Sequence, residues 1–337
     1  MDAAAVVDRF GLDESARVWL EEAAALPLPE GGVPLPVRAR AAEALAPFAP
    51  SRRDAAELIE AWPDPAWPVE LWWLLERMYA RVAADLAEGR REWRSWPNLI
   101  AAEDVRVRCA VVYALAAAVP LLEAVYDRHG VPEEVRAATL RDIGRHIGHS
   151  RAMFGRLGLE TVTWAALHFR AGLYELGRLQ YEPATLSTAG AVRWYGSGAA
   201  AGLGPELAEG APALRLHIPV GGPLDAPSVQ RSLDAARGFF RSCFAADYPV
   251  ATCTSWLLDP QLADHLPESS NILAFQRRFT LVEADAPGDA DVFRFVFRMA
   301  EVDPARTPAR TTLERAAAGL VRSGGSWRVR TGWLRLA

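Results

Sequence analysis

The sequence of 337 residues contains no lysine, so its 37 basic side chains are all arginines. Chemistry that needs a lysine amine is therefore excluded, including a Schiff base, a pyridoxal phosphate anchor and a P-loop lysine. Cysteine is also scarce. Cys109, Cys243 and Cys253 have neither paired nor metal-type spacing, which favours a reducing compartment and predicts a cytoplasmic protein.

Charge runs and long apolar runs are missing as well. The net charge is −5 and the arginines are scattered, so we expect no nucleic-acid partner. Asp2 and Asp8 near the start, without a basic segment, argue against a signal peptide. The longest uncharged run, Cys109–Leu122, is too short to cross a bilayer and contains Pro120. We therefore expect a buried helix there and no membrane partner.

The first part of the chain has helical texture, and proline-rich breaks such as Leu26–Glu30 divide it. Hydrophobic residues make up 51% of the chain, enough for a sizeable core. The apolar spacing predicts an all-helical domain over residues 1–158. The helices are expected at Asp2–Phe10, Asp13–Ala25, Val37–Phe48, Arg52–Ala61, Val69–Glu88, Asp104–Val119 and Pro132–Gly155.

The second part, residues 159–337, is predicted to mix helices and strands, which makes the fold class α+β. Strands are expected at Tyr174–Tyr181, Leu214–Pro219, Val250–Leu258, Arg278–Glu283, Val292–Arg298 and Trp327–Leu336. Helices are expected at Thr161–Gly172, Pro227–Phe244, Gln261–Leu266, Ser269–Gln276 and Thr312–Val321.

The segment Leu214–Phe240 is the most informative. An alternating strand runs into the turn Gly221–Gly222, and that turn opens a long helix. This arrangement directs unpaired backbone N–H groups and a positive helix end at one point, which suits a phosphate-bearing ligand. Glycines also serve in many ordinary strand-to-helix turns, so a purely structural turn is the alternative.

The order of these elements resembles that of the GNAT superfamily of acyl-CoA N-acyltransferases. The sequence is similar to those of a bacterial subgroup that has a helical N-terminal domain and a GNAT-like C-terminal domain. The resemblance is carried by His217–Leu224, Ser232–Phe240, Ser255–Leu262 and Ser269–Phe279. It implies a splayed central sheet, an acyl-CoA co-substrate, an amine acceptor and no metal.

The resemblance also implies a coenzyme A site. Pro219 and the two following glycines lie where GNAT enzymes bind the pyrophosphate, but no Arg or Gln opens this loop and Pro223 lacks a donor. Backbone N–H groups of this loop would bind the co-substrate. The N–H of Ile218 or Val220 would face the thioester carbonyl. Arg277 and Arg278, with Arg178, either grip a phosphate or carboxylate or are solvated at the surface. The residues assigned to the co-substrate are Ile218, Val220, Gly221, Gly222, Leu224, Arg277 and Arg278.

The acid and base are harder to assign. His217, or Glu182 at the end of an early strand, is the candidate base, because an imidazole titrates near neutral pH. Each has a structural alternative, as a hydrogen-bonded histidine or a solvated carboxylate. The superfamily often uses a tyrosine acid, but Ser269–Phe279 has none, which leaves Ser255, Cys253 or a water.

Other motifs have plainer explanations. His146 and His149 have a spacing that can hold a metal, but a solvent-facing pair is the preferred interpretation. The tryptophans of the first domain are assigned to core packing rather than to an acyl pocket.

The sequence therefore predicts an acyl-CoA-dependent N-acyltransferase that acts on a small-molecule amine, with a homodimer as a possible assembly. The alternative is a degenerate GNAT-like module that binds acyl-CoA, another ligand or a partner protein without turnover.

Overall fold

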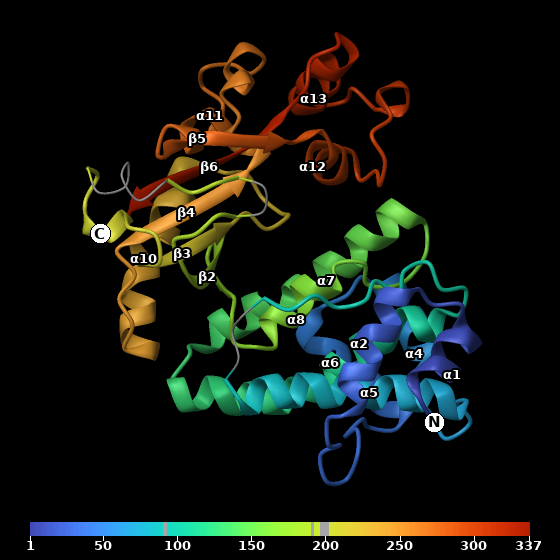
Figure 1. The fold of residues 1–337 in the computed structure, drawn as a ribbon. Coiled ribbons are helices and arrows are strands. Elements are labelled where there is room, and N and C mark those ends of the chain that lie inside the picture. The colour runs from blue at the N-terminus through green and yellow to red at the C-terminus, as the bar shows by residue number, and fades with distance from the viewer. Residues whose placement is uncertain (90–92, 190–191, 196–201) are drawn as a thin grey trace. The chain divides into compact units, whose positions relative to one another are not determined.

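The computed structural model describes residues 1–89, 93–189, 192–195 and 202–337 (Figure 1). The chain divides into a helical unit, Met1–Tyr174, and a sheet unit, Glu175–Ala337. This confirms the α+β fold class. The predicted boundary at residue 158 precedes this division, because α8 (Val162–His168) packs on α7 (Glu133–Phe154) and stays with the helical unit.

The helical unit follows the predicted pattern closely. Several of its helices start at a side-chain cap; Asp13, for example, accepts a hydrogen bond from the amide of Ala16. The segment predicted as one helix over Val37–Phe48 is broken into 3-10 turns around the short α3. The remaining helices are α1 (Ala3–Phe10), α2 (Glu14–Ala24), α3 (Ala41–Leu45), α4 (Arg52–Glu60), α5 (Val69–Ala87) and α6 (Val105–His129).

Helix α6 is the core helix of this unit. It continues through Pro120 to His129, beyond the predicted end at Val119. Pro120 is exposed, and Leu122 and Tyr126 beyond it are fully buried, so packing offsets the lost backbone hydrogen bond. Among the described residues, α6 alone is long and apolar enough to cross a membrane, but 67% of its most apolar window is buried inside the protein. A core helix explains that composition.

A six-stranded sheet forms the second unit, in the order β1-β2-β3-β4-β6-β5. Strands β3 and β4 are parallel, and β2–β3, β4–β6 and β5–β6 are antiparallel. The elements are β1 (Tyr174–Leu176), β2 (Leu179–Thr185), β3 (Pro212–His217), α10 (Ala226–Phe244), β4 (Val250–Ser255), α11 (Asn271–Gln276), β5 (Thr280–Pro287), α12 (Asp289–Val292), α13 (Thr312–Arg322) and β6 (Arg328–Arg335).

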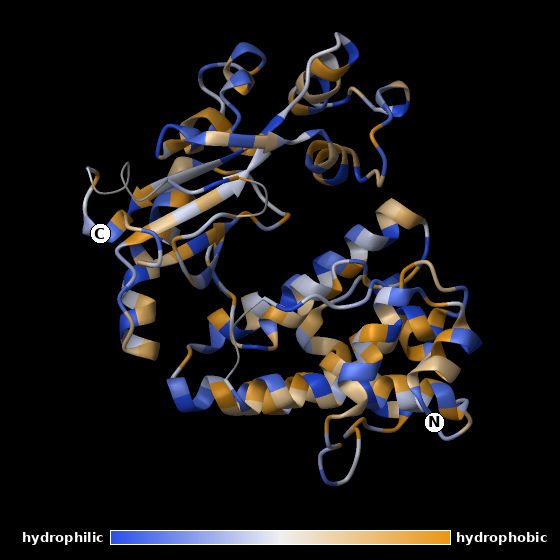
Figure 2. Ribbon diagram, viewed as in Figure 1, coloured by the Kyte–Doolittle hydropathy of each residue, from blue (hydrophilic) through white to orange (hydrophobic). Residues whose placement is uncertain are grey.

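Helix α10 packs on one face of this sheet, and apolar and polar stretches alternate along it in Figure 2. The Ser232 hydroxyl donates to the carbonyl of Leu176 and accepts from the amide of Leu179, 3.3 Å away. It also lies 3.1 Å from the Tyr181 hydroxyl. These bonds fix the first two strands to the helix that follows the Gly-Gly turn.

Two predicted strands were wrong. The segment Tyr174–Tyr181 is a hairpin, because Gly177 adopts a φ of +72° and reverses the chain between β1 and β2. The segment Val292–Arg298 is helical instead, and a π-turn, Phe293–Phe297, follows α12. Adjacent Val292 and Phe293 are both fully buried, so burial there does not alternate as a strand requires.

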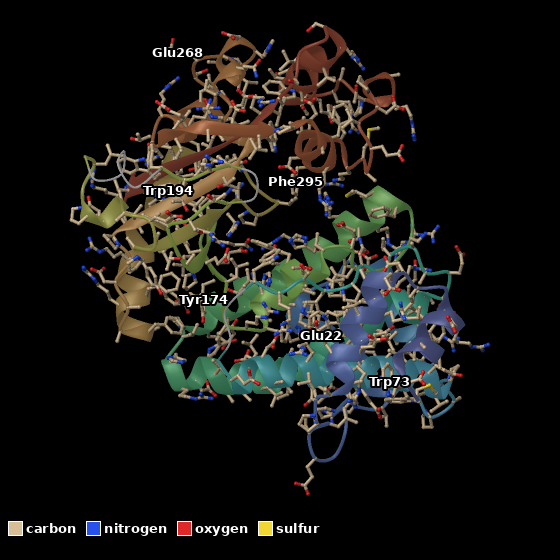
Figure 3. All side chains as sticks on the ribbon, viewed as in Figure 1. Glu22, Trp73, Tyr174, Trp194, Glu268 and Phe295 are labelled. Carbon is tan, nitrogen blue, oxygen red and sulfur yellow. The ribbon has the colours of Figure 1, made fainter. Side chains whose placement is uncertain are left out.

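Further apolar side chains cover the sheet on the side away from α10. Trp194 is buried there with Val250, Val282 and Trp333, and its indole N–H donates to the carbonyl of Leu207 at 3.3 Å. Figure 3 shows Trp194 beside the strands and Phe295 near α12. Phe295 is exposed, in contrast to the buried Phe293 two residues earlier.

Candidate functional site

The antiparallel pair β2–β3 carries a row of polar side chains on one face. Gln180 pairs with His217 and Glu182 pairs with Arg215, so all four project to the same side. The alternate residues, including Tyr181, project to the opposite face, where α10 lies. The alternation of polar and apolar residues in both strands therefore creates a polar strip in the middle of the sheet unit.

Glu182 and His217 form a hydrogen-bonded pair within this strip. Glu182 Oε2 lies 3.0 Å from His217 Nε2, and the side chains are 7% and 29% exposed. Arg215 donates to Glu182 Oε1 at 3.2 Å and to the Ser187 hydroxyl at 3.1 Å. In this contact a carboxylate oxygen accepts and the ring nitrogen Nε2 donates, which leaves Nδ1 as the second nitrogen of the imidazole.

The strands β3 and β4 part beside this pair. In the parallel ladder Leu214 pairs with Ala251 and Arg215 pairs with Thr252. Among the described residues the two strands pair at no further position. Strand β4 continues to Ser255, still paired with β6. A gap in the central sheet therefore opens at the end of β3, as the splayed-sheet expectation requires.

The loop after β3 presents backbone donors. Within the described residues, the amides of Val220, Gly221, Gly222 and Leu224 donate no hydrogen bond to the protein. Gly221 and Gly222 have φ values of +132° and +57°, and a Cβ on either would meet open space. The glycines are therefore needed for backbone conformation rather than for room. Uncommitted amides in such a turn form a binding position for an anion.

The start of α10 carries a negative charge next to the loop. Asp225 caps the helix, and its carboxylate accepts from the Ser228 amide at 2.9 Å. This hydrogen bond lowers the pKa of Asp225, so the group is ionised at neutral pH. An anionic cap offsets the positive helix end, so cations near the loop must supply the charge for binding a phosphate.

The predicted arginines lie apart. Arg278 donates to the Gln230 side chain at 2.5 Å and to the Ala226 carbonyl at 3.3 Å, which places it against the first turns of α10. Arg277 instead donates to the carbonyl of Glu268 at 2.8 Å. The structure thus brings Arg278, but not Arg277, to the helix that follows the loop.

The candidate acids on β4 do not join the Glu182–His217 pair. By the sheet register Ser255 shares the face of Ala251, whereas His217 shares the face of Thr252. Ser255 also accepts a hydrogen bond from the amide of Leu257 at 3.1 Å. The alternative, Cys253, is fully buried, and burial raises the pKa of its thiol to about 12. Neither residue is placed as a partner for the histidine.

The helical unit contains a second polar cluster, centred on Asp142 of α7. Its carboxylate, 2% exposed, accepts hydrogen bonds from Arg145 at 2.8 Å and from the indole of Trp164 and the imidazole of His168 at 3.1 Å. His146 Nε2 lies 3.3 Å from it. This arrangement links α7 to α8.

That cluster corrects the interpretation of His146 and His149 as a solvent-facing pair. His146 contacts the carboxylate of Asp142, one turn earlier on the same helix. Its Nδ1 also shares a hydrogen bond with the Thr161 hydroxyl, 2.9 Å away. His149 is buried. The acidic partner was overlooked because it lies at the fourth residue before His146 rather than beside it. Across the described ranges, no group of three or more His, Cys, Asp or Glu side chains is arranged to hold a metal ion.

Sequence reasoning also missed how Arg178 is used. It lies in the two-residue turn of the β1–β2 hairpin and donates to three carbonyls of the loop after β3. The signal was present, because Gly177 followed by one polar residue between two leucines is typical of a tight hairpin turn. The cap at Asp225 was likewise readable from an Asp placed three residues before Ser228.

Comparisons with known proteins agree with this geometry. Residues 39–171 match the family model described as the N-acyltransferase N-terminal domain, and residues 173–334 match the GNAT-like C-terminal domain. No curated protein sequence matches the chain.

Solved structures give a further comparison. The chain is 33% identical to an acyltransferase crystallised with decanoyl-CoA and teicoplanin, with a TM-score of 0.87 and complete coverage of both chains. The same values hold for an acyltransferase mutant in complex with octanoyl-CoA and for an acyltransferase in complex with CoA and 10C-teicoplanin. The chain belongs to the family of two-domain acyltransferases in which an N-acyltransferase N-terminal domain precedes a GNAT-like C-terminal domain.

Proposed function

We propose that this protein is an acyl-CoA-dependent N-acyltransferase that transfers an acyl group from the thioester to an amine of a small molecule. One observation carries the proposal. The uncommitted amides of the loop, the gap between β3 and β4, and the Glu182–His217 pair all meet at the end of one strand. Phosphate binding, carbonyl polarisation and proton transfer are thus available in one place.

The reaction needs little covalent help, because a thioester is already reactive toward an amine. The amine nitrogen attacks the acyl carbon, the C–N bond forms and the C–S bond breaks. Negative charge develops on the acyl oxygen in the transition state, and backbone N–H groups are effective donors to it. The amide of Ile218, the first residue after β3 and beyond the paired part of β3 and β4, is the proposed donor.

His217 is the proposed base. Nδ1 of the neutral ring takes a proton from the attacking amine, and Glu182 stabilises the resulting imidazolium through the 3.0 Å contact with Nε2. The proton then passes to the departing thiolate, directly or through water. The balance is an amide and a free thiol for one thioester and one amine. No acidic side chain from β4 is required.

The choice of substrates rests on the related structures. Acyltransferases that are 33% identical to this chain bind decanoyl-CoA, octanoyl-CoA and teicoplanin. We therefore propose medium-chain acyl-CoA thioesters as donors and an amine-bearing small molecule as acceptor. The cytoplasmic location and the homodimer stay predictions.

Thiol release tests the proposal. The protein is incubated with acetyl-, octanoyl- or decanoyl-CoA and an amine panel that includes teicoplanin, and free CoA and the acceptor mass are measured. We expect amine-dependent CoA release and an acceptor heavier by one acyl group. His217→Gln should lower kcat about 10²- to 10⁴-fold, whereas His265→Gln, an exposed histidine outside the site, should not.

Two results would contradict it. Binding of acyl-CoA without thiol release for any amine would support the degenerate module. If the His217→Gln variant releases CoA as fast as the parent, His217 is not the base.

A further inference from the structure

The turn between β1 and β2 reaches the loop that follows β3. Arg178, in that turn, donates through Nε to the carbonyl of Pro223 at 3.0 Å. Its two terminal nitrogens donate to the carbonyls of Pro219, at 3.1 Å, and Gly222, at 3.2 Å. One guanidinium therefore holds both ends of the loop through its backbone oxygens.

These bonds decide where two of the loop amides, those of Val220 and Leu224, point. In a trans peptide, the carbonyl of one residue and the N–H of the next point in opposite directions. Holding the Pro219 carbonyl therefore turns the Val220 N–H away from Arg178, and holding the Pro223 carbonyl does the same for Leu224. The bond to the Gly222 carbonyl orients no N–H group, because the next residue, Pro223, is a proline and has none.

The charge of Arg178 adds to this effect. No arginine lies within the loop itself, and the ionised Asp225 at the start of α10 offsets the helix dipole. A guanidinium bonded to the carbonyl oxygens polarises the same peptide groups and lowers the cost of an anion on their N–H side. The planar fork suits this role, because several N–H groups reach separate carbonyls at fixed angles.

We propose that Arg178 is a positioning residue that orients the Val220 and Leu224 amides of the loop 219–224 toward the diphosphate of acyl-CoA. This inference rests on the proposed function. Arg178 acts through the loop: its guanidinium lies on the carbonyl side, and the diphosphate binds on the N–H side.

A comparison of two donors tests the role. Kinetic constants are measured for decanoyl-CoA and for decanoyl-pantetheine, which keeps the thioester but lacks the diphosphate. For Arg178→Gln we expect KM for decanoyl-CoA to rise about tenfold, as loss of a few loop-orienting hydrogen bonds implies. We expect kcat to stay within about twofold and decanoyl-pantetheine kinetics to stay unchanged. Arg178→Lys should fall between, because an ammonium cannot replace the fork.

Binding of CoA, measured by calorimetry, gives a readout independent of turnover. The dissociation constant should rise about tenfold in Arg178→Gln. The matched control is Arg322→Gln, which removes an arginine that likewise donates to two loop carbonyls, those of Pro304 and Thr307, elsewhere in the sheet unit. That variant should bind CoA as the parent does.

The outcomes separate the two claims. A parent protein that neither binds CoA nor releases it from decanoyl-CoA contradicts the proposed function. A parent that does both, with an Arg178→Gln variant that binds CoA equally well, overturns the inference. An equal loss of kcat/KM on both donors also overturns it, since a general structural defect would affect them alike. If Arg178→Gln does not fold, the same criteria apply to Arg178→Lys.

Discussion

Replacing Asp142 by asparagine perturbs the buried cluster of the helical unit without leaving a cavity. The carboxylate accepts from Arg145, Trp164 and His168, and its side chain is 2% exposed. An asparagine amide of the same shape directs N–H groups at neighbours that are themselves donors. Removing one partner of a buried charged network costs about 3–5 kcal/mol. For a unit of this size the melting temperature should fall by roughly 6–20 °C.

The pH dependence gives the same prediction a second test. Burial alone raises the pKa of Asp142, but the hydrogen bonds and charges of His146 and His168 outweigh it, so the pKa lies well below its usual range. A lowered folded-state pKa means that the stabilisation is present above the unfolded-state pKa, about 3.9. It is then lost as the pH falls toward the folded-state value. The difference between parent and variant should therefore be full at pH 7 and shrink below about pH 4.

Scanning calorimetry at several pH values measures both effects. The control is Glu43→Gln, which breaks an ion pair with Arg40 in which both side chains are about two-thirds exposed. Surface pairs of this kind contribute little, so no resolved change is expected. If the Asp142→Asn variant and the parent have the same melting temperature at pH 7, the account of this cluster is refuted.

Three further changes test other parts of the structure. Gly221→Ala should raise the KM for acyl-CoA in steady-state kinetics, because a φ of +132° is strained for alanine. The control is Gly238→Ala in α10, where a Cβ also meets open space. This control variant should leave the KM unchanged. Ser232→Ala should destabilise the protein by about 1–3 kcal/mol in urea unfolding, since the Leu179 amide loses its buried acceptor; an unchanged midpoint would argue against that link. Iodoacetamide at pH 8 should label Cys243 before Cys109 and Cys253, because burial raises the pKa of both buried thiols to about 12; peptide mass mapping with Cys253 labelled first would contradict this.

The fold was largely predictable where periodicity and caps agree. Helix α10 and strand β6 were predicted to within two residues, because an amphipathic stripe and a long alternating run leave little choice. The predictions failed where one residue decides the path. Gly177 turns a predicted strand into a hairpin. The run Val292–Phe297, apolar except for Arg294, is too short to show a period that separates strand from helix.

The site was predictable residue by residue but not as a constellation. His217 and Glu182 were each proposed from strand position, and their contact follows from a β2–β3 register that no local pattern states. The same register separates Ser255 from them. Arg178 reaches the loop from 41 residues away, measured to Pro219. Only the folded hairpin brings those two segments together.

The most direct test of the central claim is a crystal structure of the protein soaked with CoA. The account predicts the diphosphate within hydrogen-bond distance of the Val220, Gly221 and Gly222 amides, with the thiol directed into the gap between β3 and β4 near His217. A diphosphate bound elsewhere, with these amides facing solvent, would contradict it.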